Sequence, residues 1–426
     1  MPKRFVTLLV VILAACNLNR PTTIAPPDTR GSDGVLTVAW ADNGDLMVWR
    51  AGDEAPPRRI ASGGVIQPYL APDGEHVVFT RGPQGQPETL WVVDFLGTAE
   101  QELVDAGDVR VLSGGQPLIG DVRWFDESAL YFNTVHAFEH GVEAQNDLYR
   151  ANVRTREVAL ILPRTEGGQF AISPDREHIA VVYPGTYGRQ DGRISVIDPL
   201  ALEPARNLLF FVGVSTGSEF GFYPTIHWRP DSSSVLVAVP DKDLVYDDIN
   251  SPPVTLWELP VDVPSNRAII GSVPATFFAL PGWSSQSEHL VYMQRVGQVT
   301  SNEFELHLAS ADGSDTEVYA SGQASTISAP QWIAGTDTFV YVQGNPGEYW
   351  LAGPGLAPQR LPNGSETMFL PRFLDGTVYV FVRDAEESPQ LRYARLDQID
   401  SPSSLIAPLS GLSPGFDAVL VPQQEA

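Results

Sequence analysis

The sequence predicts an all-β chain that forms a single β-propeller of eight four-stranded blades. Three observations support this prediction: turn-forming residues are spread along the whole chain, one sequence unit recurs, and the two ends carry complementary parts of a further unit. The chain has 426 residues, with 37 Gly and 36 Pro. Turn residues at this density are typical of short strands joined by tight connections.

Composition narrows the class of protein. Asp and Glu number 52 against 27 Lys and Arg, which gives a net charge of −25. Nucleic-acid binding depends mainly on cationic side chains that neutralise phosphates, so DNA and RNA are excluded as expected partners. The 43% apolar and 10% aromatic content is enough for a large core, and 19% charged residues is too few for a solvated disordered chain.

The N-terminus has the pattern of an export signal. Lys3 and Arg4 precede an apolar stretch at 5–15, and small residues lead up to Cys16. This stretch is too short to cross a bilayer comfortably, and its basic, apolar and small-residue order is that of a signal peptide. We therefore interpret residues 1–15 as a signal peptide and not as part of the fold.

The residues at 13–16, Leu-Ala-Ala-Cys, resemble a bacterial lipoprotein signal. The resemblance implies cleavage before Cys16, attachment of diacylglycerol to its sulfur, and a location on the extracytoplasmic side of the bacterial cell envelope. Cys16 is the only cysteine of the chain. An ordinary secretory signal with an incidental cysteine is the alternative. Residues 16–34 are then the lipidated cysteine and a flexible tether, with a root-mean-square span of about 20 to 25 Å.

The repeated unit begins with an anchor residue, continues through a turn of the Ser-Pro-Asp-Gly kind and ends in an apolar run. A unit of this length fits one four-stranded propeller blade. Its seven anchors, 54, 48, 56, 55, 49 and 41 residues apart, are Leu70, Trp124, Ile172, Trp228, Trp283, Trp332 and Phe373. Five units also carry an aromatic residue in a later strand, at Trp91, Tyr149, Trp257, Trp350 and Tyr393.

The turns at 72–74 (PDG), 173–175 (SPD) and 229–231 (RPD) resemble those of TolB-type, WD-repeat-like bacterial β-propellers. The resemblance covers nearly all of the chain after residue 34. It implies the fold and not an activity, because propellers have many functions. The turns at 125–127, 285–287 and 335–337 depart from the motif.

The two ends of the repeat region determine the expected number of blades. Residues 35–41, 45–50 and 58–61 read as the last three strands of a unit, and FDAVLV at 416–421 reads as a strand without partners. Together they make one composite blade, which adds to seven complete units. We therefore expect eight blades within residues 35–422, a tail at 423–426, and a monomeric ring. Seven blades is the alternative.

Two catalytic motifs occur, each in an unsuitable context. HAFEH at 136–140 matches a zinc pattern that requires a helix, whereas this segment joins two predicted strands, so we expect an exposed insertion loop. GVSTG at 213–217 matches the nucleophile elbow, but a strand follows it where a helix is needed. We therefore expect no catalytic residue and no cofactor.

One loop concentrates carboxylates that a hard cation such as Ca²⁺ would favour. It contains Asp241, Asp243, Asp247 and Asp248, without the glycine and terminal glutamate of an EF-hand. A solvated acidic loop is the preferred interpretation, so these residues are weak metal candidates.

The residues directly before the anchors are the candidate ligand-binding site. The first strand of each blade borders the central channel, and we expect its beginning to open onto one mouth of the ring. Arg offers a planar donor group that suits carboxylate or phosphate. The candidates, expected to bind an anionic or sugar-like group, are Tyr69, Arg123, His227, Gln331 and Arg372. The alternative is that these side chains pack between blades.

These observations favour a lipid-anchored, non-enzymatic propeller that binds a protein, peptide or glycan, or serves as a scaffold. The alternative function is an envelope enzyme, such as a glycan hydrolase or lyase, that uses the propeller funnel. Such an enzyme would need paired carboxylates near the channel.

Overall fold

The computed structural model describes residues 34–422, with several short segments left out. These are residues 54, 106, 110–115, 139–140, 187, 215–221, 243–251, 276–279, 297–302, 324–326, 328–329, 345–346, 362–367, 386–387 and 399–400. Cys16, the signal peptide and most of the tether therefore lie outside the described residues, as does the tail at 423–426.

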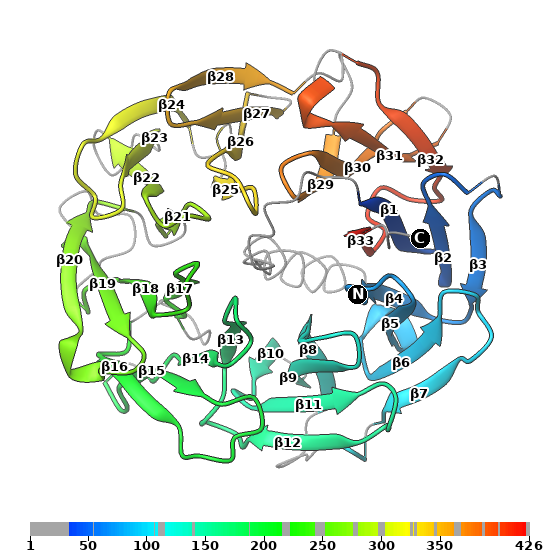
Figure 1. Ribbon diagram of the computed structural model, residues 1–426, viewed down its shortest axis with the longest axis horizontal. Helices are drawn as coiled ribbons and strands as arrows, with labels where there is room; N and C mark the ends of the chain where they lie inside the picture. The colour runs from blue at the N-terminus through cyan, green and yellow to red at the C-terminus, as the bar shows by residue number, and fades with distance from the viewer. Residues whose placement is uncertain are drawn as a thin grey trace, which may run out of the picture.

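The described residues form a ring of eight antiparallel sheets around a central axis (Figure 1). This confirms the predicted eight-bladed β-propeller. Each sheet is one blade, with its first strand nearest the axis and its fourth at the outer rim (Figure 1). The aromatic residues at 91, 149, 257, 350 and 393 lie on the third strands of their blades, as the repeat predicted.

The first half of the ring comprises blades 1 to 4, whose strands run in the following order from the axis outward. Blade 1 has β33 (Phe416–Val421), β1 (Val35–Asp42), β2 (Asp45–Arg50) and β3 (Arg58–Ala61). Blade 2 has β4 (Val65–Leu70), β5 (His76–Arg81), β6 (Thr89–Asp94) and β7 (Gln101–Val104). Blade 3 has β8 (Gln116–Trp124), β9 (Ala129–Phe138), β11 (Leu148–Asn152) and β12 (Val158–Leu162), with β10 (Gly141–Ala144) as an extra strand beside β9. Blade 4 has β13 (Gln169–Ile172), β14 (Ile179–Tyr183), β15 (Gly192–Ile197) and β16 (Arg206–Phe211).

The other half of the ring repeats this arrangement. Blade 5 has β17 (Thr225–Trp228), β18 (Ser234–Val239), β19 (Val254–Pro260) and β20 (Ala268–Val273). Blade 6 has β21 (Gly282–Trp283), β22 (His289–Val296), β23 (Glu303–Ser310) and β24 (Glu317–Gln323). Blade 7 has β25 (Gln331–Trp332), β26 (Phe339–Gln343), β27 (Glu348–Gly353) and β28 (Leu356–Arg360). Blade 8 has β29 (Met368–Leu374), β30 (Val378–Arg383), β31 (Gln390–Arg395) and β32 (Ser404–Pro408). Three short 3₁₀ turns are η1 (Pro83–Gly85), η2 (Pro264–Asn266) and η3 (Leu396–Gln398).

The C-terminal strand closes the ring. β33 pairs antiparallel with β1, from Val35 opposite Val421 to Trp40 opposite Phe416, and the red β33 lies beside the blue β1 in Figure 1. The composite blade predicted from the two ends is confirmed. Because β33 covers the inner edge of β1, that edge does not offer unpaired backbone groups to another chain.

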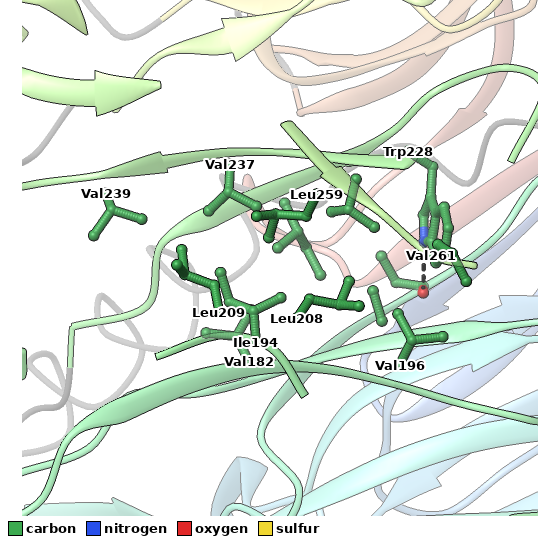
Figure 2. Close-up of a cluster of buried hydrophobic side chains, with 14 of the residues drawn as sticks. Val182, Ile194, Val196, Leu208, Leu209, Trp228, Val237, Val239, Leu259 and Val261 are labelled. Atoms are coloured by element: carbon green, nitrogen blue, oxygen red, sulfur yellow. Dashed lines mark hydrogen bonds between the residues drawn. The ribbon is translucent and has the colours of Figure 1, made fainter. Parts of the chain in front are cut away.

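The hydrophobic core is divided into eight clusters, and each cluster fills the seam between two neighbouring blades. The seam between blades 4 and 5 shows the arrangement (Figure 2). There Val182 and Ile194 of blade 4 pack against Val237 and Leu259 of blade 5. Every blade therefore depends on both neighbours for burial of its two faces, and an incomplete ring would leave apolar surface exposed.

The turn from the first to the second strand keeps one backbone geometry in blades 2, 4, 5 and 6, even where its sequence changes. In the PDG turn, Gly74 has a φ of +68° and its N–H donates to the Ala71 carbonyl at 2.9 Å. Ser287 has a φ of +61° and its N–H donates to the Ser284 carbonyl at 2.8 Å. The departure from the motif at 285–287 thus alters the residues and leaves the hairpin intact.

Candidate functional site

Three of the anchor tryptophans form hydrogen bonds across the seams between neighbouring blades. In blades 3, 5 and 7, the anchor indole N–H donates to a backbone carbonyl of the preceding blade. The three bonds are Trp124 to Tyr69 (3.1 Å), Trp228 to Ala171 (3.0 Å) and Trp332 to Gly282 (2.7 Å). Figure 2 shows the bond of Trp228 as a dashed line. Each acceptor is the residue directly before an anchor, so the bonds recur every second blade.

Four of the five candidates lie near the ends of their inner strands and not at the beginnings, so for these four that part of the prediction is wrong. Gln331 is the first residue of the two-residue strand β25. β8 ends at Trp124 and β17 ends at Trp228, which places Arg123 and His227 one residue before the turn. The physical reason is that each anchor packs into its seam where the chain turns toward the second strand. The residues of the inner strand therefore precede the anchor in the sequence.

Arg123 is held by its own strand and faces blade 4. Its Nε and Nη2 each lie 2.7 Å from Asp121 Oδ2, and its guanidinium lies 5.4 Å from the Phe170 ring centroid. Asp121 is positioned in turn, because its N–H donates to Asn133 Oδ1 at 2.8 Å. Most of the Arg123 side chain is thereby buried at the seam.

His227 faces blade 6. Its Nε2 lies 3.1 Å from Ser287 Oγ, and its ring centroid lies 6.4 Å from that of Trp283. Burial, together with the positive charge of Arg229, lowers the pKa of His227 to about 4. The imidazole is therefore neutral at pH 7 and acts as a hydrogen-bonding group at this seam.

The other three candidates lie on blades 2, 7 and 8. Tyr69 is buried in the seam between blades 2 and 3, and Gln331 is half-buried on the two-residue strand β25. Arg372 Nη2 lies 2.6 Å from Asp417 Oδ1 on the closing strand. The five candidates thus lie on five different blades, and the contacts of Tyr69, Arg123, His227 and Arg372 are those of side chains that pack between blades.

One buried carboxylate, Asp417, is absent from the set of candidates that the sequence suggests. It lies on β33, and only 6% of its side chain is exposed. The residues around it in FDAVLV are apolar, so the segment reads as a core strand. The one available signal is a charged residue inside an otherwise apolar run at the end of the chain.

The segment that carries the zinc pattern is a β-hairpin, so the predicted exposed insertion loop is wrong for its first part. β9 runs through His136 to Phe138, and β10 pairs with it so that Glu143 lies opposite His136. His136 is buried, whereas residues 139–140 lie outside the described residues. A strand separates the side chains of the motif differently from a helix, so the pattern does not have its required backbone.

The weak metal candidates receive little structural support. Asp241 is exposed, and Asp243, Asp247 and Asp248 lie outside the described residues. Within the described part of the chain, no three His, Cys, Asp or Glu side chains are grouped to hold a metal ion. Among the same residues, no helix is long and apolar enough to cross a membrane.

Comparisons with known proteins bear on the fold alone. No protein-family model matches the chain, and no curated protein sequence matches it. An oligogalacturonate lyase in complex with manganese is 13% identical, with a TM-score of 0.50 over 86% of this chain and 98% of the lyase. Porphyromonas gingivalis dipeptidyl peptidase 4 is 14% identical, with a TM-score of 0.53 over 80% of this chain and 53% of the peptidase.

A structure described as the eukaryotic initiation factor is 10% identical, with a TM-score of 0.51 over 90% of this chain and 98% of that chain. The chain thus spans about half of the peptidase and nearly all of the other two proteins. At these sequence identities the structural similarity establishes the propeller architecture but does not indicate a shared activity.

Proposed function

We propose that this protein is a lipid-anchored, extracytoplasmic β-propeller that binds a protein, peptide or glycan without catalysing a reaction. One observation carries the proposal. The closed ring begins at Val35, 19 residues after the cysteine of the lipoprotein-like signal. The anchored body would therefore be the propeller itself, held near the membrane by a short tether.

The connectivity of the blades supports an orientation for the anchored ring. Val35 pairs with Val421, and a Cβ atom at Gly74 would lie 2.5 Å from Val421. A tether that precedes Val35 would therefore join the ring on the face that carries the first-to-second-strand turns. That face bears acidic turn residues, including Asp73, Asp126, Asp175 and Asp231. Their charge would disfavour flat contact with anionic lipid and keep the ring at a distance from the membrane.

Replacement of Cys16 by serine tests the anchor. We expect Cys16→Ser to abolish lipidation and to leave precursor or released protein, because the thiol is the acceptor of the diacylglyceryl group. The measurement is incorporation of labelled fatty acid together with membrane fractionation. Lipid incorporation by the serine variant would contradict the lipoprotein interpretation, and the alternative of an ordinary secretory signal predicts no lipid on either protein.

An affinity pull-down from the native membrane tests the binding function, and Arg123 tests the site. For a ligand identified in this way, we expect Arg123→Ala to weaken binding at least tenfold, about 1.4 kcal/mol. Arg59→Ala is a matched control, because Arg59 also has an aspartate partner, Asp45 at 3.1 Å, but lies on the outer strand β3. Arg372 is unsuitable for this test because its replacement would also disturb Asp417.

Unchanged affinity in a folded Arg123 variant would show that the ligand binds elsewhere, on the outer rim or on the opposite face of the ring. The enzyme alternative is tested with the same preparation, by a screen for turnover of glycans and esters. Turnover that survives purification and follows the propeller through gel filtration would contradict the non-enzymatic proposal.

A further inference from the structure

The closing strand has an unusual combination of side chains. Phe416 and Ala418 are buried against blade 8, and Val419 packs in the seam with blade 2. Apolar residues therefore point to both faces of β33. A strand that is apolar on both faces specifies its register weakly, because a shift along its partner still buries apolar side chains.

Asp417 is the exception, and its carboxylate connects three blades. Oδ2 accepts the backbone N–H of Leu70, on blade 2, at 2.7 Å. Oδ1 lies 2.6 Å from Arg372 Nη2, on blade 8, and also accepts the N–H of Ala418 at 2.9 Å. The Asp417 side chain is 6% exposed and that of Arg372 is 31% exposed, so the pair lies at the border between the seam and solvent.

A buried carboxylate is tolerated only where its partners are in place. Removal of one partner from a buried ion pair is strongly destabilising, since it leaves an uncompensated charge. A shift of β33 by one residue would turn Asp417 to the other face of the sheet, and a shift by two would move it away from Leu70 and Arg372. Each wrong register would therefore bury a carboxylate without its donors.

The same contacts join β33 to the blades on either side of it. Asp417 adds donors from both neighbouring blades to the backbone pairing with β1. Gln67 adds a further contact, because its Nε2 donates to the Phe416 carbonyl at 3.1 Å.

We propose that Asp417 is the latch of the ring, and that its carboxylate holds β33 in one register on β1. Arg372 is the positioning residue of this latch. The role is separate from the proposed binding function, since it concerns how the ring closes.

The test compares Asp417→Asn with wild type by hydrogen exchange and by light scattering across a range of protein concentrations. We expect the amides of β1 and β33 to exchange at least tenfold faster in the variant. We also expect association that increases with concentration, because each opening of β33 exposes the edge of β1. Asp45→Asn is the matched control, because it removes an exposed aspartate–arginine pair from the same blade. We expect this control to remain monomeric with unchanged exchange.

A second variant keeps the test decisive if Asp417→Asn does not fold. Arg372→Gln retains the carboxylate and removes its cation, and we expect the same selective increase in exchange at β1 and β33. The double variant Asp417→Leu with Arg372→Met separates stability from register. It should recover thermal stability through apolar packing, while the amides of β1 and β33 still exchange faster than those of the other blades.

Unchanged exchange and a monomeric state in Asp417→Asn and in Arg372→Gln would overturn the latch. An equal increase in exchange over all eight blades would also overturn it, because that result describes a general stabilising contact and not a determinant of closure.

Discussion

Removal of residues 416–426 is expected to lower the melting temperature by about 10 °C and to cause aggregation. The deletion removes the apolar side chains of β33 from two seams, where each large side chain contributes about 2 kcal/mol. It also exposes the inner edge of β1, from Val35 to Trp40, which then offers unpaired backbone groups to other molecules.

Calorimetry and light scattering measure the two effects of this deletion. The matched control removes only residues 423–426 and keeps the whole of β33. We expect the control to melt as the full chain does. An unchanged melting curve in the longer deletion would show that the paired strand contributes nothing to closure.

Acidification is expected to destabilise the protein as the pH falls below about 6.5, the ordinary pKa of histidine. Burial lowers the pKa of His136, His227 and His307 in the folded protein. The unfolded chain therefore binds protons at a pH where the folded chain does not. For His227, whose folded pKa is about 4, the loss between pH 7 and pH 5 is on the order of 2 kcal/mol.

The measurement is the free energy of unfolding in urea at pH 7 and at pH 5, for wild type and for His227→Gln. We expect the wild type to lose about 2 kcal/mol more than the variant between these two conditions. Comparison of the two proteins cancels the contribution of Asp147, whose pKa is raised by burial and which acts in the opposite direction. Equal losses in both proteins would show that His227 does not bind its proton differently in the folded and unfolded states.

Much of the fold could be predicted from the sequence, because a propeller repeats its local chemistry in every blade. The anchors, the turns and the third-strand aromatics each recur, and agreement between them identified seven complete units. The closure could also be predicted, since a blade without its first strand and an orphan strand at the other end complete each other. The turn at 285–287 shows how local hydrogen bonding preserves a hairpin after its signature has changed.

The candidate site was predicted less well, because its details depend on contacts between blades. The sequence could show that polar residues precede the anchors, but not that Arg123 contacts Phe170 or that His227 contacts Ser287. It could not pair Arg372 with Asp417, since these residues meet only after the ring has closed. His136 was misplaced because a hairpin extension and a loop leave similar patterns in a short polar segment.

The indole bonds of Trp124, Trp228 and Trp332 join blade 2 to blade 3, blade 4 to blade 5 and blade 6 to blade 7. Blades 8 and 1 form the remaining pair, and across their seam the Arg372–Asp417 ion pair joins them. The ring is therefore built from four joined pairs of blades. Partial opening detected by hydrogen exchange should separate one pair from the next, and the two blades of a pair should exchange together.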